Sequence, residues 1–166
     1  MPVYDVPLSV AGIDEIIREL NSFRRKLNEA ETKIVQGLAD DAEASMRERL
    51  TSVTNPDGNV DASVGSVGSG NEAYVYLTGE QAAYLEFGTG VVGESSRHTM
   101  AGQVGWEYNI GPHIRTFKNG KIGWIYFDRS KGHYRVTSGI KPQYIVVGAA
   151  STARSMIARR IREALR

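Results

Sequence analysis

The residues Gly88-Thr89-Gly90-Val91-Val92-Gly93 spell G-x-G-x-x-G, the glycine spacing of dinucleotide-binding loops. Such a loop needs a buried strand before it and a helix that opens within it, so that the pyrophosphate meets the helix N-terminus. The stretch that follows Gly93, ESSRHTMAGQVG, has no apolar helical stripe, and no βαβ pattern comes after it. The sequence therefore argues against a nucleotide site, and we expect no cofactor.

Metal and acid–base chemistry find equally weak support. His98, His113 and His133 stand 15 and 20 residues apart, without the i, i+4 pairing of helical zinc sites, and the chain has no cysteine. Carboxylates and hydroxyls occur in the same region, but no spacing orders them as nucleophile, base and orienting group; these are Glu86, Glu94, Glu107 and Ser95-Ser96. We predict no metal site and no enzyme, with a hydrolase as the least favoured alternative.

Aromatic and basic residues alternate in the second half of the chain. Aromatic side chains combined with cations can stack and bind single-stranded nucleic acid. The same pattern is expected of two packed hairpins whose aromatics are ordinary core residues, and this second interpretation is favoured. The residues concerned are Trp106, Tyr108, Trp124, Tyr126, Phe127 and Tyr134, with Lys118, Lys121, Arg129 and Arg135. A nucleic-acid-binding accessory protein is kept as the alternative function.

The composition is that of a single globular domain covering residues 1–166, with 41% hydrophobic and 23% charged residues. No apolar run reaches a membrane span, and the N-terminus lacks the pattern of a signal peptide, so we expect a cytoplasmic product. Net charge is only +1. Residues 1–50 carry ten acidic and seven basic groups, net −3, whereas residues 141–166 carry six basic groups and one acidic group, net +5. Solvated helix faces are the favoured explanation, and head-to-tail contact between copies is the alternative.

Helices are predicted at both ends of the chain. Residues 9–50 read as helical, in two pieces, with Ser9 as N-cap and Asn21-Ser22 as the break. An apolar stripe, interpreted as core, runs along the second piece at Phe23, Leu27, Ile34, Leu38, Ala42, Met46 and Leu50. A helix over 143–165 has a predicted apolar face of Val146, Ala150, Ala153, Ile157, Ile161 and Leu165.

Two hairpins are predicted between these helices. The first covers residues 60–78, with a turn near Gly68-Ser69-Gly70, and the second covers residues 122–137, with DRSKG as its turn. A short helical turn is expected over GEQAAYLEFG, and a long glycine-rich loop over residues 88–120. The fold class is α+β: a small antiparallel sheet of about four strands, packed by a long N-terminal helix and a C-terminal helix.

The segment AAYLEFGTG resembles a tail-component family of tailed phages, the tail-completion or head–tail joining proteins, which carry a tyrosine followed by E-F-G-T-G. The matching residues are Tyr84, Glu86, Phe87, Gly88, Thr89 and Gly90. Further family signals follow in order over residues 73–150: Val91-Val92-Gly93, His98, Gly105-Trp106-Glu107-Tyr108, Gly123-Trp124-Ile125-Tyr126, Thr137-Ser138-Gly139 and Tyr144. The chain departs from the family at Thr99, where a proline is usual, and at Tyr144, where a phenylalanine is usual.

The resemblance implies a structural virion protein without catalysis, assembled in the host cytoplasm and located at the neck or tail. Copies would form a ring, expected to be a hexamer, between head-connector or stopper proteins and the tail tube or tail terminator. DNA would pass through its channel without sequence-specific binding, and no membrane is involved.

The residues suggest how such a protein would work. Glu86-Phe87 would anchor the end of the sheet with Phe87 buried, and Gly88 and Gly90 would turn the chain sharply into the long loop. Candidate contacts with partners are His98, Trp106, Tyr108, Arg154, Arg159, Arg160 and Arg162.

Overall fold

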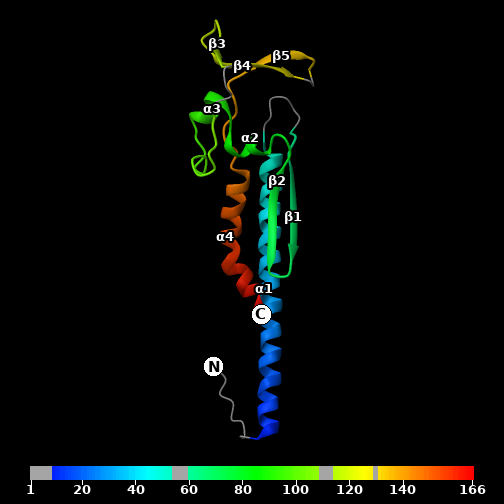
Figure 1. Cartoon of the computed structure of the whole chain (residues 1–166). Helices are drawn as coiled ribbons and strands as arrows, with labels where there is room; N and C mark the ends of the chain where they lie inside the picture. The colour runs from blue at the N-terminus through cyan, green and yellow to red at the C-terminus, as the bar shows by residue number, and fades with distance from the viewer. Residues whose placement is uncertain (1–8, 54–59, 109–113, 129–130) are drawn as a thin grey trace.

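The computed structural model describes residues 9–53, 60–108, 114–128 and 131–166. Its helices and small antiparallel sheets confirm the predicted α+β class. One long helix runs from the lower end of the molecule to the level of α2, a second helix and a hairpin lie along its upper part, and the remaining elements are stacked beyond its end (Figure 1). Of the helices in these ranges, none is long and apolar enough to cross a bilayer.

The long helix α1 spans Val10–Thr51. Ser9 caps it as predicted, because its Oγ accepts a hydrogen bond from the backbone N of Gly12 at 3.1 Å. The predicted division into two pieces is wrong: the helix continues through Asn21 and Ser22. Each of these residues costs only a fraction of a kcal/mol inside a helix, roughly 0.5 kcal/mol relative to Ala, so a pair of them does not stop a long helix.

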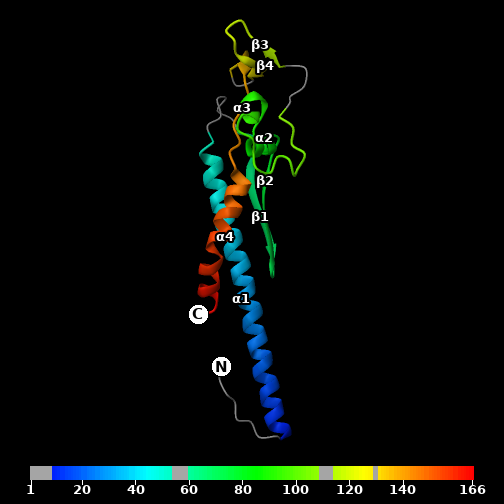
Figure 2. The same ribbon diagram turned by 90° about the vertical axis from the view of Figure 1, so that its left-hand side faces the viewer.

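Helix α4 spans Ile145–Ala164 and lies antiparallel to the C-terminal half of α1 (Figure 2). Polar contacts join the two helices. Ser45 Oγ lies 3.2 Å from Thr152 Oγ1, and Arg160 forms two hydrogen bonds with Asp41, of 2.6 and 2.8 Å. The side chain of Arg160 crosses α1 at Gly37, where a Cβ would approach its Nε to 3.0 Å.

The apolar face predicted for α4 is wrong by about one residue. Ile145 and Ala149 are buried, whereas Ile157 and Ile161 remain about 40% exposed. Since Thr152 and Arg160 continue the buried side of the helix, polar residues occupy the face that the hydrophobic pattern assigned to solvent.

The first hairpin, predicted over residues 60–78, is confirmed. Strand β1 (Ser63–Ser69) pairs antiparallel with β2 (Glu72–Thr78), and Gly70, with a φ of +62°, begins the turn. The hairpin lies along α1 and is held there in part by Arg47, whose Nη2 donates to the carbonyl oxygen of Val64 at 3.1 Å. The same region holds the hydrophobic core.

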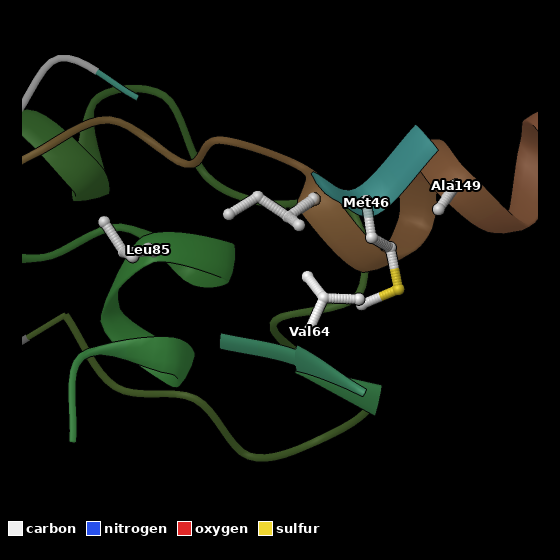
Figure 3. Close-up of a cluster of buried hydrophobic side chains, with 5 residues drawn as sticks. Met46, Val64, Leu85 and Ala149 are labelled. Atoms are coloured by element: carbon white, nitrogen blue, oxygen red, sulfur yellow. The ribbon is translucent and has the colours of Figure 1, made fainter. Parts of the chain in front are cut away.

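That core is small (Figure 3). It comprises Met46, Val64, Leu85, Ile145 and Ala149, drawn from α1, β1, the short helix α2 (Ala82–Phe87) and α4. Met46 and Ile145 are its largest fully buried side chains. Of the stripe predicted as core on α1, Met46 is therefore confirmed, but Phe23 and Leu27 are 60% and 46% exposed.

The second hairpin, predicted over residues 122–137, is also confirmed, although part of its turn lies outside the described residues. Strands β3 (Arg115–Thr116), β4 (Ile122–Asp128) and β5 (His133–Thr137) form a separate three-stranded sheet, so the expected single sheet of about four strands is in fact two sheets. The long loop predicted over 88–120 contains β3 and a short helix, α3 (Gly90–Glu94). The described part of that segment therefore contains regular secondary structure, which the prediction of a loop did not include.

Candidate functional site

The E-F-G-T-G motif lies where α2, α3 and the start of α4 meet, and its carboxylate is buried. Glu86 is only 4% exposed. Its Oε2 accepts a hydrogen bond from the backbone N of Val146 at 2.7 Å, and its Oε1 accepts one from Val147 at 3.1 Å. Both donors belong to the first turn of α4, where N–H groups lack partners within the helix. Glu86 therefore caps α4 from a different helix.

The residue that precedes α4 explains why a cap must come from elsewhere. Tyr144 occupies the N-cap position with a φ of +52°, and its side chain makes no capping hydrogen bond. A carboxylate at the positive end of the helix dipole is stabilising. Glu86 supplies this negative charge together with the missing acceptors.

His98 packs directly against this carboxylate. Its side chain is completely buried, and its Nε2 lies 3.2 Å from Oε1 of Glu86. Nδ1 accepts a hydrogen bond from the backbone N of Met100 at 3.1 Å, so in the neutral ring the proton is on Nε2 and faces Glu86. The approach is close but poorly directed, and among the described residues Nε2 has no well-aligned hydrogen-bond partner.

Aromatic rings enclose the imidazole. Tyr144 stacks on His98 with ring centroids 4.3 Å apart, and Phe87 meets it edge-on at 4.8 Å. Phe87 in turn stacks on Trp106 at 5.2 Å, and Trp106 Nε1 donates to the carbonyl oxygen of Gly88 at 3.1 Å. Tyr84 meets Trp106 edge-on at the rim and is 48% exposed. The rings form one continuous cluster.

Tyr108 joins the two sides of the motif. Its Oη accepts a hydrogen bond from the backbone N of His98 at 2.6 Å, and its carbonyl oxygen accepts one from the N of Gly90 at 3.1 Å. The guanidinium of Arg97 lies over its ring, 5.8 Å from the centroid. A single buried tyrosine thus holds the loop that carries His98 against the glycine turn.

Gly88 and Gly90 have the positive φ values that a sharp turn requires, +78° and +61°, and the turn leads into α3 instead of directly into a loop. Close packing adds a second reason for small residues here. A Cβ at Gly139, where φ is +101°, would lie 1.8 Å from the carbonyl oxygen of Thr89. Two hydrogen bonds fix this approach: Thr89 N donates to the carbonyl of Ile140 at 2.9 Å, and Ile140 N donates to Thr89 Oγ1 at 3.2 Å.

The structure brings most of the predicted motif and contact residues together, but with altered roles. Glu86 is buried and caps a helix, whereas Phe87, expected to be buried at the end of the sheet, is only half-buried. His98 and Tyr108, named as partner contacts, are buried inside the chain. The contact between Gly139 and the motif is not predicted from the sequence. The one signal that could have indicated it is the segment Thr137-Ser138-Gly139.

The four arginines of α4 lie far from this site, and two of them are already paired. Arg160 binds Asp41, and Arg159 Nε donates to Glu163 at 3.0 Å. The hydrogen bonds from Arg160 hold the pKa of Asp41 below its ordinary value. Arg154 and Arg162 are exposed. Arg160 therefore belongs to the α1–α4 interface and is not a free contact residue.

The chemistry available at the junction is capping and packing. Within residues 9–53, 60–108, 114–128 and 131–166, no three His, Asp or Glu side chains gather as a metal site would require. We call the set Glu86, Phe87, Gly88, Thr89, Gly90, His98, Trp106, Tyr108, Gly139 and Tyr144 the motif junction.

Comparison of the chain with protein-family models, curated proteins and solved structures finds no match.

Proposed function

We propose that the chain is a structural virion protein of a tailed phage that completes the tail or joins the tail to the head. The resemblance of Tyr84–Gly90 and the segments after it to the tail-component family supports this role. The structural observation that best supports this role is that the residues of the motif hold the elements of the chain together. Glu86 caps α4, and His98 and the aromatic rings pack around it, so the motif maintains the architecture of the chain.

In this role several copies form a ring at the neck, expected to be a hexamer, between head-connector or stopper proteins and the tail tube or terminator. Closed rings are built from one surface of a copy against a different surface of its neighbour. Large hydrophobic side chains exposed at both ends of the molecule support such contacts. Those at one end lie on α1 and those at the other on the β4–β5 hairpin.

The outer face of the β4–β5 hairpin is the surface that best fits a neighbouring protein. It carries two cross-strand pairs, Ile125 with Val136 and Phe127 with Tyr134, and the rings of the second pair lie 5.2 Å apart. All four side chains are exposed, by 39% to 73%. Exposed apolar patches of this kind mark interaction surfaces.

The same hairpin bears on the alternative, a nucleic-acid-binding protein. Stacking surfaces for single strands combine aromatic rings with cations that follow the backbone. On β4–β5, Arg135 pairs across the strands with Tyr126, on the face opposite Phe127, and its Nη1 lies 3.2 Å from Asp128. The exposed aromatic pair is thus flanked by aliphatic residues, which favours a protein partner.

The deciding experiment is deletion of the gene from its phage or prophage, followed by electron microscopy of the particles. DNA-filled heads beside detached or irregular-ended tails are expected. Normal tailed particles would refute the proposal. Binding of the purified protein to unrelated oligonucleotides, with affinity falling linearly in log salt, would then support the alternative.

A charge test addresses the basic end of the chain. Because Arg160 is needed inside the fold, the reversal is made at Arg154, Arg159 and Arg162, each changed to Glu. Weakened assembly with unchanged thermal unfolding is expected if this face docks on an acidic neighbour. Full complementation by the triple variant would show that α4 charge has no part in joining.

A further inference from the structure

The N-terminal half of α1 projects beyond the other helices and strands that the structure describes (Figures 1 and 2). The hairpin turn reaches no farther along α1 than Glu31, whose Oε1 accepts a hydrogen bond from Asn71 at 3.3 Å. Among the described residues, the hydrogen bonds made within residues 10–29 are local to the helix and its cap. The projecting segment, residues 10–29, is about 30 Å long at 1.5 Å per residue.

This projecting segment carries an apolar stripe with the spacing of a coiled coil. Intervals of three and four residues alternate along it, as in a heptad whose a and d positions are apolar. Position a is occupied by Ile13, Leu20 and Leu27, and position d by Ile16 and Phe23. These five side chains are 38% to 62% exposed.

The stripe continues an interface that already exists inside the chain. When the heptad repeat is continued along α1, the next d positions are Ala30, which is buried, and Gly37, which faces Arg160 of α4. One side of α1 is thus covered in its C-terminal half by α4 and uncovered in its N-terminal half. A helix that met the uncovered part would complete the same interface.

The charges beside the stripe specify which helix fits. Glu19 and Lys26 occupy g positions, and Arg24 and Glu31 occupy e positions. In a parallel pair of identical helices, each g residue lies beside the e residue of the next heptad on its neighbour. Glu19 would then meet Arg24 of the second copy. Lys26 would meet Glu31, which lies just beyond the projecting segment and also accepts the hydrogen bond from Asn71.

An antiparallel pair of the same helices is less well matched. Positions g then face each other, so Glu19 would meet Lys26, but Ile17 at e would face Arg24 instead of an acid. Parallel pairing also keeps the folded bodies of the paired copies at one end.

We propose that residues 10–29 of α1 form a parallel coiled coil with the same segment of other copies of this chain. The inference rests on the self-assembly contained in the proposed function and deepens it by naming the segment and its direction. The partner is a second copy, identified by the heptad stripe and by the complementary e and g charges.

Single cysteines provide the first test, because the chain has none of its own. Ile13→Cys, at position a, is expected to form a disulfide-linked dimer under mild oxidation. Arg18→Cys, at the outward position f and only five residues away, is the matched control and is expected to remain uncrosslinked. Equal crosslinking of both variants, or none in Ile13→Cys, would overturn the proposal.

Charge exchange provides the second test and fixes the direction. Glu19→Lys should weaken self-association, measured as molar mass by light scattering, and adding Arg24→Glu should restore it. In an antiparallel pair the restoring change would instead be Lys26→Glu. Restoration by that variant, or an unchanged mass in Glu19→Lys, would contradict a parallel coiled coil.

Failure of this inference can be told apart from failure of the proposed function. If Ile13→Cys does not crosslink while deletion of the gene leaves detached tails, the virion role stands and the copies meet through other surfaces. If crosslinking occurs while the deletion yields normal tailed particles, the coiled coil stands and the virion role falls. The full-length protein is used in both experiments.

Discussion

The motif junction and the projecting segment of α1 differ in which kinds of side chain they bury and which they expose. The junction buries a carboxylate, an imidazole and a tyrosine, whereas the projecting segment exposes isoleucine, leucine and phenylalanine. Burying charge is costly unless it is paired, and exposing a continuous apolar stripe is costly unless another surface covers it. The junction is complete within one chain, and the projecting segment is not.

The two regions should therefore differ in how much they stabilise a single copy. The small core around Met46 and Ile145, together with the junction, secures the upper part of the molecule. The projecting segment contributes little to the stability of a single copy, because its apolar side chains remain exposed. Substitutions in the two regions should therefore affect different measurements.

The largest loss of stability is expected from Gly139→Ala. Its Cβ would lie 1.8 Å from the carbonyl oxygen of Thr89 at a φ of +101°, so the turn must move and break the contact with the motif. We expect a loss of about 3 kcal/mol or more in the free energy of unfolding, measured by urea titration. Gly102→Ala, where a Cβ meets nothing within 4 Å, is the control. Similar midpoints for the two variants would contradict the tight approach.

A somewhat smaller loss is expected from Glu86→Ala. The change leaves two N–H groups of α4 without acceptors and removes the charge beside His98, which should cost about 2–4 kcal/mol. Glu94→Ala is matched in type and lies nearby, but Glu94 is exposed, and among the described residues its ion-pair partner is Arg97. Thermal unfolding of both variants provides the comparison. Equal stability would mean that the cap contributes nothing.

The pair between Asp41 and Arg160 should contribute less than either of these, because the two side chains remain partly exposed and solvent screens their interaction. The pKa of Asp41 is lowered in the folded chain, mainly by the hydrogen bonds from Arg160. Its stabilisation is therefore present above the unfolded pKa of about 4 and is lost as pH falls through the lower folded value. Asp41→Asn should be less stable at pH 7 and should lose less stability on acidification than the native chain. A parallel pH dependence would argue against the pair.

The smallest effect on stability is expected in the projecting segment. Phe23→Ala should change the free energy of unfolding of the dilute protein by no more than about 0.5 kcal/mol, whereas Met46→Ala in the same helix should cost about 2–5 kcal/mol. Self-association should show the reverse order, with Phe23→Ala the more damaging change. A large loss of stability in dilute Phe23→Ala would show that the segment packs within its own chain.

Local signals in the sequence predicted much of the fold. Ser9 was identified as a cap because a hydroxyl before an apolar-periodic run can accept from the first turn, and the structure agrees. Both hairpins followed from strand-forming residues around turn residues. The positive φ values of Gly88 and Gly90 followed from the demand for a sharp turn.

Long-range contacts decided the features that the sequence did not predict. The buried side of α4 contains Thr152 and Arg160 because α1 offers Ser45 and Asp41 opposite them, and hydrophobic periodicity contains no information about such partners. The capping role of Glu86 depends on residues sixty positions away. No pattern within one segment could have indicated it.

The continuity of α1 has a consequence for the exchange of its backbone amide hydrogens with solvent. About twenty residues of helix without tertiary contacts are only marginally stable in water, so residues 10–29 open often in an isolated copy. Amides near Met46 open only when the core does. Deuterium uptake along α1 should therefore fall steeply between its two halves in dilute protein. Assembly would make it nearly uniform, so this single helix would report whether its chain is alone.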